Sequence, residues 1–172
     1  MASRWWHTPR TAPAVDAWIT REFTVRGLAP PDCTPEALAR ALERERQITI
    51  EFRPHASDDP GVYGLLYRPE GCAHTYVIVF RPTYSIALRR LTLFHELAHI
   101  LFEHPLTEAA GVGTLRGYMV SDQADAMAEA FAVGAMQYSF LDEAVSRAPT
   151  DAEDDVLASA CGQLLKRTQY RP

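Results

Sequence analysis

Residues 85–104 contain neither glycine nor proline, while Pro82 precedes them and Pro105 follows. This pattern predicts a single helix, because proline is excluded from helix interiors and common at their boundaries. On a helical wheel, one side of this helix is apolar and can be buried in the core, while another side can face a cleft. The apolar side carries Leu93, Leu97, Ile100 and Leu101.

The face expected at the cleft carries an H-E-x-x-H motif formed by His95, Glu96 and His99. Histidines four residues apart project from one helix face, so both imidazoles can bind one metal ion. The glutamate can then accept a proton from water activated by the metal, as in zinc-dependent hydrolases, most often peptidases. The alternative is a helix that carries these residues by coincidence, which the suitable context disfavours.

Two histidines do not complete a catalytic zinc site, which has three protein ligands and one position open to water. One subclass supplies a third histidine through the pattern H-E-x-x-H-x-x-G-x-x-H. Phe102 and Pro105 stand at its glycine and final histidine positions, so this subclass is excluded. The remaining arrangement takes a carboxylate from a second, downstream helix.

An alanine-rich segment at residues 121–138 begins with a Ser-Asp capping signal and is predicted to be that helix. Asp125 and Glu129 lie four residues apart on one face, so one can bind the metal while the other accepts the N–H of a ligand histidine. Alternatively, Asp125 only favours the positive helix end and Glu129 is a solvated surface residue. Glu103 is a weaker candidate ligand, and Asp122 is better explained as a cap.

Together, these segments resemble the signatures of ImmA/IrrE-type zinc metallopeptidases, a gluzincin-like H-E-x-x-H family. There, His-Glu-Leu-(Gly/Ala)-His is followed a few tens of residues later by acid-x-x-Ala-(Asn/Asp/Glu)-x-Phe-Ala, which residues 125–132 match. The resemblance implies zinc ligands, a general base and an outer partner that supports a ligand. It assigns the ligand roles to His95, His99 and Asp125. It assigns the role of general base to Glu96 and the supporting role to Glu129.

The chain departs from this family at two places. The family usually has glutamate where Asp125 stands, so the second helix must approach more closely or the ligand role passes to Glu129. The usual Leu-Leu-Met-Pro ending is replaced by Ala-Met-Gln-Tyr at residues 135–138. The resemblance covers about residues 35–140.

The elements before the motif predict an α+β fold. A helix is expected over residues 35–46, with Thr34 as N-cap and Pro35 at its first position. Three strands are then expected at residues 48–52, 62–67 and 74–80. With the two site helices, this order predicts a minimal zincin-like domain, in which a small three-stranded sheet packs with the H-E-x-x-H helix and a second ligand-bearing helix.

The flanking regions are less regular. Residues 1–30 are expected to form a Trp/Pro-rich N-terminal arm with a short helix at residues 14–23, and residues 31–172 to form a single domain. Residues 105–120 are predicted to be a loop over the cleft, and a last helix is expected from residue 150 to 165. Tyr118 is a candidate oxyanion stabiliser or a surface tyrosine, and His104 either reaches the cleft or is incidental.

Composition excludes several classes of protein. A net charge of −5 and a pI of about 5.7 argue against direct nucleic-acid binding. No apolar run reaches the length of a membrane span, and the first ten residues lack the apolar region of a secretory signal. The three cysteines are widely spaced and without metal-type pairing, which favours reduced thiols in the cytoplasm.

The sequence therefore predicts an intracellular zinc-dependent metallo-endopeptidase that binds its substrate as an extended strand at the sheet edge. The family resemblance implies that the protein substrate is a regulator such as a helix-turn-helix repressor. The alternative is a zinc-binding regulatory or sensing module that contacts a transcription regulator without proteolysis. A less favoured alternative is a metal hydrolase of non-peptide substrates.

Overall fold

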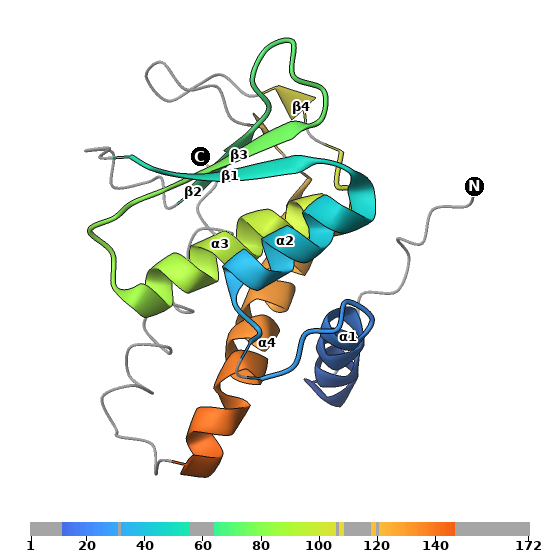
Figure 1. The fold of residues 1–172 in the computed structure, drawn as a ribbon, viewed down its shortest axis with the longest axis vertical. Helices are drawn as coiled ribbons and strands as arrows, with labels where there is room; N and C mark the ends of the chain where they lie inside the picture. Colours follow the sequence, from blue (N-terminus) through green and yellow to red (C-terminus); the bar gives the residue numbers. More distant parts are fainter. Residues whose placement is uncertain are drawn as a thin grey trace.

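The computed structural model describes residues 12–30, 32–55, 64–105, 107–108, 118–119 and 121–146, which form an α+β fold (Figure 1). Four helices and a three-stranded mixed sheet dominate these residues. The elements in chain order are α1 (Ala12–Thr24), α2 (Pro35–Arg46), β1 (Thr49–Pro54), β2 (Gly64–Tyr67), β3 (Thr75–Phe80), α3 (Ile86–Leu101), β4 (Thr107–Glu108), β5 (Tyr118–Met119) and α4 (Asp122–Ser146).

The larger sheet has the order β1-β3-β2, so β3 is central and β2 lies at an edge. β1 runs parallel to β3, and β2 runs antiparallel to β3 with Gly64 opposite Phe80. The predicted strands are confirmed, although β1 continues to Pro54, two residues beyond its predicted end. β4 and β5 form a second, antiparallel pair inside the segment predicted to be a loop, so that part of the prediction was wrong.

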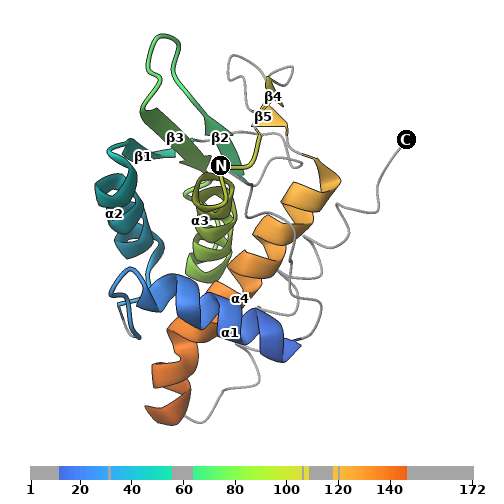
Figure 2. The same cartoon turned by 90° about the vertical axis from the view of Figure 1, so that its right-hand side faces the viewer.

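The helices pack as layers beneath the larger sheet. Figures 1 and 2 show α2 and α3 side by side on the same face of the sheet, with α3 beneath β2 and β3. α4 crosses α3 at a steep angle and makes the most extensive helix contact in the described chain, and α1 packs against α4. This arrangement brings the first turn of α4 next to the middle of α3.

Aromatic residues fill the centre of the helical layer. Phe23 of α1, Phe94 of α3 and Phe131 of α4 are fully buried, and the ring of Phe23 lies 6.1 Å from Phe94 and 6.0 Å from Phe131. Trp18 of α1 stacks on Phe102 at a centroid distance of 4.9 Å. α1, predicted at residues 14–23, therefore belongs to the same hydrophobic core as the site helices, whereas Trp5 and Trp6 lie outside the described residues.

The starts of α2 and α4 carry side-chain caps of the kind predicted from the sequence. The Thr34 hydroxyl accepts a hydrogen bond from the Ala37 backbone N–H at 3.1 Å, and Pro35 occupies the first position of α2. At the start of α4 the cap is Ser121, whose hydroxyl accepts from the Ala124 N–H at 3.2 Å. Asp122 lies in the first turn rather than at the cap position that the sequence suggested.

α3 ends at Leu101, three residues before the predicted end at His104. Glu103 adopts a left-handed conformation with φ 53°, and the His104 N–H donates to the His99 carbonyl at 3.0 Å. This is the Schellman type of helix ending, in which a residue at positive φ turns the chain back across the last turn. Proline at position 105 therefore follows the ending but does not cause it.

The carbonyls at the end of α3 are bound by a residue of α2. The Arg46 guanidinium donates to the Ile100 and Leu101 carbonyls at 2.5 and 2.6 Å. A positive charge at a helix C-terminus also interacts favourably with the helix dipole. α2 therefore holds the end of the helix that carries both histidines.

α4 extends to Ser146, beyond the predicted end at residue 138. The helix predicted from residue 150 lies outside the described residues. Within the described residues, every helix is too short or too polar to cross a lipid bilayer.

Candidate metal centre

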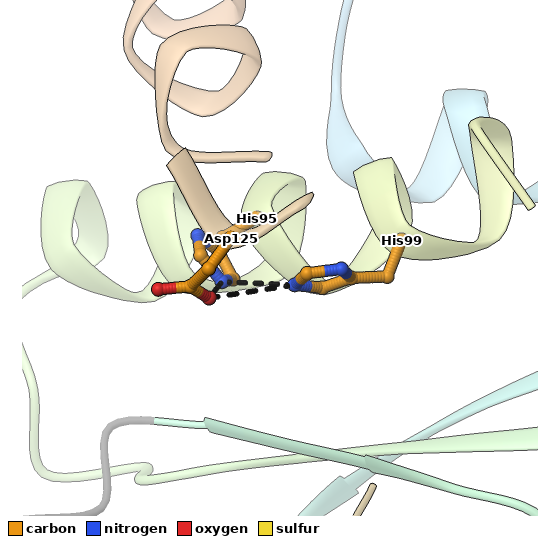
Figure 3. A group of neighbouring side chains, drawn as sticks. All are labelled: His95, His99 and Asp125. Carbon is orange, nitrogen blue, oxygen red and sulfur yellow. Dashed lines mark hydrogen bonds and ion pairs between the residues drawn. The ribbon is translucent and has the colours of Figure 1, made fainter. Parts of the chain in front are cut away.

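Three side chains from two helices meet at one point. His95 and His99 project from α3, and Asp125 projects from the first turn of α4 (Figure 3). His95 Nε2 lies 3.1 Å from His99 Nε2 and 3.1 Å from Asp125 Oδ1, and His99 Nε2 lies 3.8 Å from the same carboxylate oxygen. The three potential ligand atoms are therefore close enough to one another for a single ion to contact all of them.

The donor set fits a zinc ion. Zinc binds imidazole nitrogen and carboxylate oxygen at about 2.1 Å, and tetrahedral geometry then separates neighbouring ligand atoms by about 3.4 Å. The observed separations of 3.1 to 3.8 Å bracket that value. The three residues can hold a metal ion, and no fourth side chain from the described part of the chain joins them.

The site is buried on the α3 side and open on the α4 side. The His99 side chain is 4% exposed and that of His95 is 15% exposed, whereas the Asp125 side chain is 42% exposed. Solvent therefore reaches the ligand atoms past the carboxylate.

The two histidines have opposite electrostatic environments. Burial lowers the pKa of His95, but the hydrogen bond to Asp125 and the negative charges of Glu96 and Asp125 outweigh burial, so the pKa is raised. Burial, followed by the charge of His95, lowers the pKa of His99 to about 3. His99 is therefore neutral at physiological pH, as a metal ligand must be.

Glu129 lies one turn beyond Asp125 and is buried. Burial raises the pKa of its carboxyl, and the negative charge of Asp125 adds to this effect while His95 opposes it. Asp125, although one methylene shorter than the expected glutamate, is the acid that reaches the histidines. Within the described residues Glu129 makes no hydrogen bond to either of them and the buried Nδ1 of His95 has no partner, so its expected supporting role remains a prediction.

Glu96, the expected general base, lies against the backbone of the edge strand. A Cβ atom placed on Gly64 of β2 would be 2.9 Å from Glu96 Oε1 and 2.5 Å from Thr92 Cγ2. Because real Cβ contacts are not that short, only glycine fits at this position without displacing its neighbours. Gly64 was not among the site residues predicted from the sequence, although an isolated glycine in a strand pattern signals a close approach of this kind.

His104 contacts the side of His99 that faces away from Asp125. The two Nδ1 atoms are 2.9 Å apart, and both side chains are buried. His104 is therefore not a fourth ligand in this arrangement, since the converging atoms are the Nε2 atoms. The sequence made His104 a candidate residue of the cleft, but it could not show which side of His99 this residue would contact.

The remaining candidates from the sequence do not join this cluster. Glu103 is exposed and forms an ion pair with Arg46 at 3.4 Å. Tyr118 belongs to β5, and its side chain lies outside the described part of the structure. Among the described residues, the group of histidine, cysteine and acidic side chains that can share a metal ion is His95, His99 and Asp125.

Comparisons with models of protein families, with curated proteins and with solved structures found no match to this chain. A function must therefore be inferred from the residues and their geometry.

Proposed function

We propose that this protein is a zinc-dependent metallo-endopeptidase with a zincin-like fold. The observation that carries the proposal is the convergence of His95 Nε2, His99 Nε2 and Asp125 Oδ1 within 3.8 Å of one another. A bound zinc ion would polarise a scissile carbonyl and lower the pKa of coordinated water to near 7. The sequence resemblance to ImmA/IrrE-type peptidases agrees with this choice of metal and reaction.

Glu96 is the residue proposed to move the proton. It follows His95 directly in α3, and its negative charge helps to raise the pKa of His95. In the proposed reaction Glu96 accepts a proton from the attacking water and delivers it to the leaving amine. A structural zinc site has no need of such a base, and the three-residue donor set leaves room for water.

The edge strand favours a peptide as the substrate. Among the described strands β2 pairs with β3 alone, although β5 also lies near it, and a Cβ atom on its Gly64 would be 2.9 Å from Glu96 Oε1. A peptide added in extended form along β2 would lie beside the proposed base, with backbone hydrogen bonds as its main source of affinity. The family resemblance extends this proposal to a helix-turn-helix repressor as the physiological substrate.

The test is peptide cleavage by zinc-loaded protein compared with the Glu96→Gln variant. Both proteins are incubated with a proteome-derived peptide library and with candidate repressors, and new N-termini are identified by mass spectrometry. We expect the variant to retain one zinc per chain and to lose about 10²- to 10⁴-fold in rate. Equal cleavage by both proteins would refute the role of Glu96, and a repressor bound but left intact would favour a regulatory zinc module.

A further inference from the structure

The histidine outside the ligand set has a defined relation to the metal centre. His104 Nδ1 lies 2.9 Å from His99 Nδ1, and the two rings have a centroid separation of 5.0 Å. His99 is 4% exposed and His104 is 6% exposed, so neither nitrogen can exchange this partner for bulk water. A buried contact of this kind requires one ring to donate a proton and the other to accept it.

Coordination of a metal ion by His99 would determine which of the two rings donates the hydrogen bond. His99 Nε2 is the atom that faces His95 and Asp125, and a ligand nitrogen must be free of its proton. A neutral imidazole carries one proton, which must then lie on His99 Nδ1. His104 Nδ1 therefore accepts, and its own proton lies on Nε2. The opposite arrangement would put a proton on His99 Nε2 and block the metal.

We propose that His104 is a positioning residue of the metal centre, which accepts the Nδ1–H of His99 and so keeps His99 Nε2 available to the ion. The inference rests on the proposed zinc site. It places the support of His99 on His104, whereas the sequence had assigned support of a ligand histidine to Glu129.

The helix ending holds His104 in this position. The turn at Glu103, with φ 53°, reverses the chain so that the His104 N–H donates to the His99 carbonyl at 3.0 Å. The same residue pair is thus joined twice, once through the backbone and once through the rings. The Phe102 ring, which stacks on Trp18, lies 5.8 Å from the His104 ring. His104 is therefore held by contacts that do not involve a metal ion, as a positioning residue must be.

Two substitutions separate positioning from packing. His104→Asn retains an acceptor oxygen on Cγ, near the place of Nδ1, whereas His104→Leu fills similar space without an acceptor. The measurement is the dissociation constant for Zn²⁺, obtained by competition with a chromogenic chelator, with the urea midpoint of the metal-free protein as a check on folding. We expect His104→Leu to bind Zn²⁺ about 10- to 100-fold more weakly, and His104→Asn to stay within about threefold of the wild type.

The outcomes distinguish this inference from the proposed function. Weak zinc binding by His104→Leu with recovery in His104→Asn supports positioning. Equal affinity in all three proteins, or equal loss in both variants, overturns it while leaving the zinc site intact. Wild-type protein that binds no zinc overturns both proposals.

If the leucine variant fails to fold, a measurement on the wild-type protein still tests the inference. Long-range ¹⁵N–¹H spectra of the zinc-loaded protein report the tautomer of each imidazole. We expect a proton on His99 Nδ1 and on His104 Nε2. The reverse assignment for either ring overturns the inference.

Discussion

Gly64 of the edge strand touches the side chain of Glu96, the residue proposed to carry the proton. A single added methyl at Gly64 would come within 2.9 Å of the carboxylate and 2.5 Å of the Thr92 methyl group. The strand and the base are therefore in direct contact.

The Gly64→Ala substitution should damage both stability and turnover. The added methyl must displace Thr92, Glu96 or the strand, and overpacking of this kind costs about 1–3 kcal/mol. We expect a lower urea midpoint, measured by circular dichroism, and slower peptide cleavage at unchanged zinc content.

The double variant Gly64→Ala with Thr92→Ser tests the cause. Serine lacks the methyl group that makes the 2.5 Å contact, so it should recover part of the lost stability. Additive effects of the two substitutions would show that the contact is not responsible.

Asp125 and Glu129 should differ in their effect on metal affinity. Asp125→Asn removes the charge of a ligand oxygen, and we expect Zn²⁺ to bind at least about 100-fold more weakly. Glu129→Gln keeps the shape of a side chain that makes no hydrogen bond to the ligand histidines. We therefore expect the affinity for Zn²⁺ to fall by less than about tenfold in this variant. Chelator competition on both proteins measures this, and the opposite ranking would give the third position to Glu129.

Metal-free protein should lose stability as the pH falls from 6.5 to 5. Burial lowers the pKa of His99 to about 3 and that of His104 to about 4, so both histidines gain protons in the unfolded chain over this range while they stay largely neutral in the folded chain. The slope that each group contributes rises toward about 1.4 kcal/mol per pH unit as the group becomes fully protonated in the unfolded chain. The raised pKa of His95 contributes stability that is already present below pH 6.5, and the raised pKa of Glu129 opposes part of the loss toward the acid end of the range.

Urea denaturation in the presence of a chelator measures this slope. The His104→Asn variant lacks one of the two titrating groups, so its slope over this range should be about half that of the wild type. Stability that does not change between pH 6.5 and 5 would contradict the buried, neutral state of both rings.

Arg46 should contribute more to stability than its neighbour Arg44. Arg46→Ala leaves the Ile100 and Leu101 carbonyls without their charged donor, and hydrogen bonds to charged groups are worth about 1.5–3 kcal/mol. Arg44 is exposed on the same helix turn and serves as the matched control, with an expected change within about 0.5 kcal/mol. Equal urea midpoints for the two alanine variants would contradict the capping role.

Helical periodicity explains what the sequence could predict. Residues four apart share a helix face in any fold, so the pairing of His95 with His99 needs no tertiary information. The same rule placed Asp125 and Glu129 on one face, and for that reason it could not choose between them. The choice depends on how closely α4 crosses α3, which is a property of packing.

The features that the sequence missed include one local turn and two contacts between distant segments. The end of α3 was predicted from the proline at position 105, but the chain turns earlier, at Glu103, where glycine is the usual residue. Gly64 reads as an ordinary interruption of an apolar strand until Glu96 is seen against it. The role of Trp18 in the core likewise depends on the docking of α1 against Phe102 and Phe131.

The ligands come from two helices that meet through their side chains, and this has a consequence for folding. A metal ion bound by both α3 and α4 would cross-link the chain between His99 and Asp125. It would stabilise the native state, and the stabilisation would increase with the affinity for the ion. Occupancy of the centre would then govern the lifetime of the protein as well as its chemistry, and a cell short of zinc would lose both together.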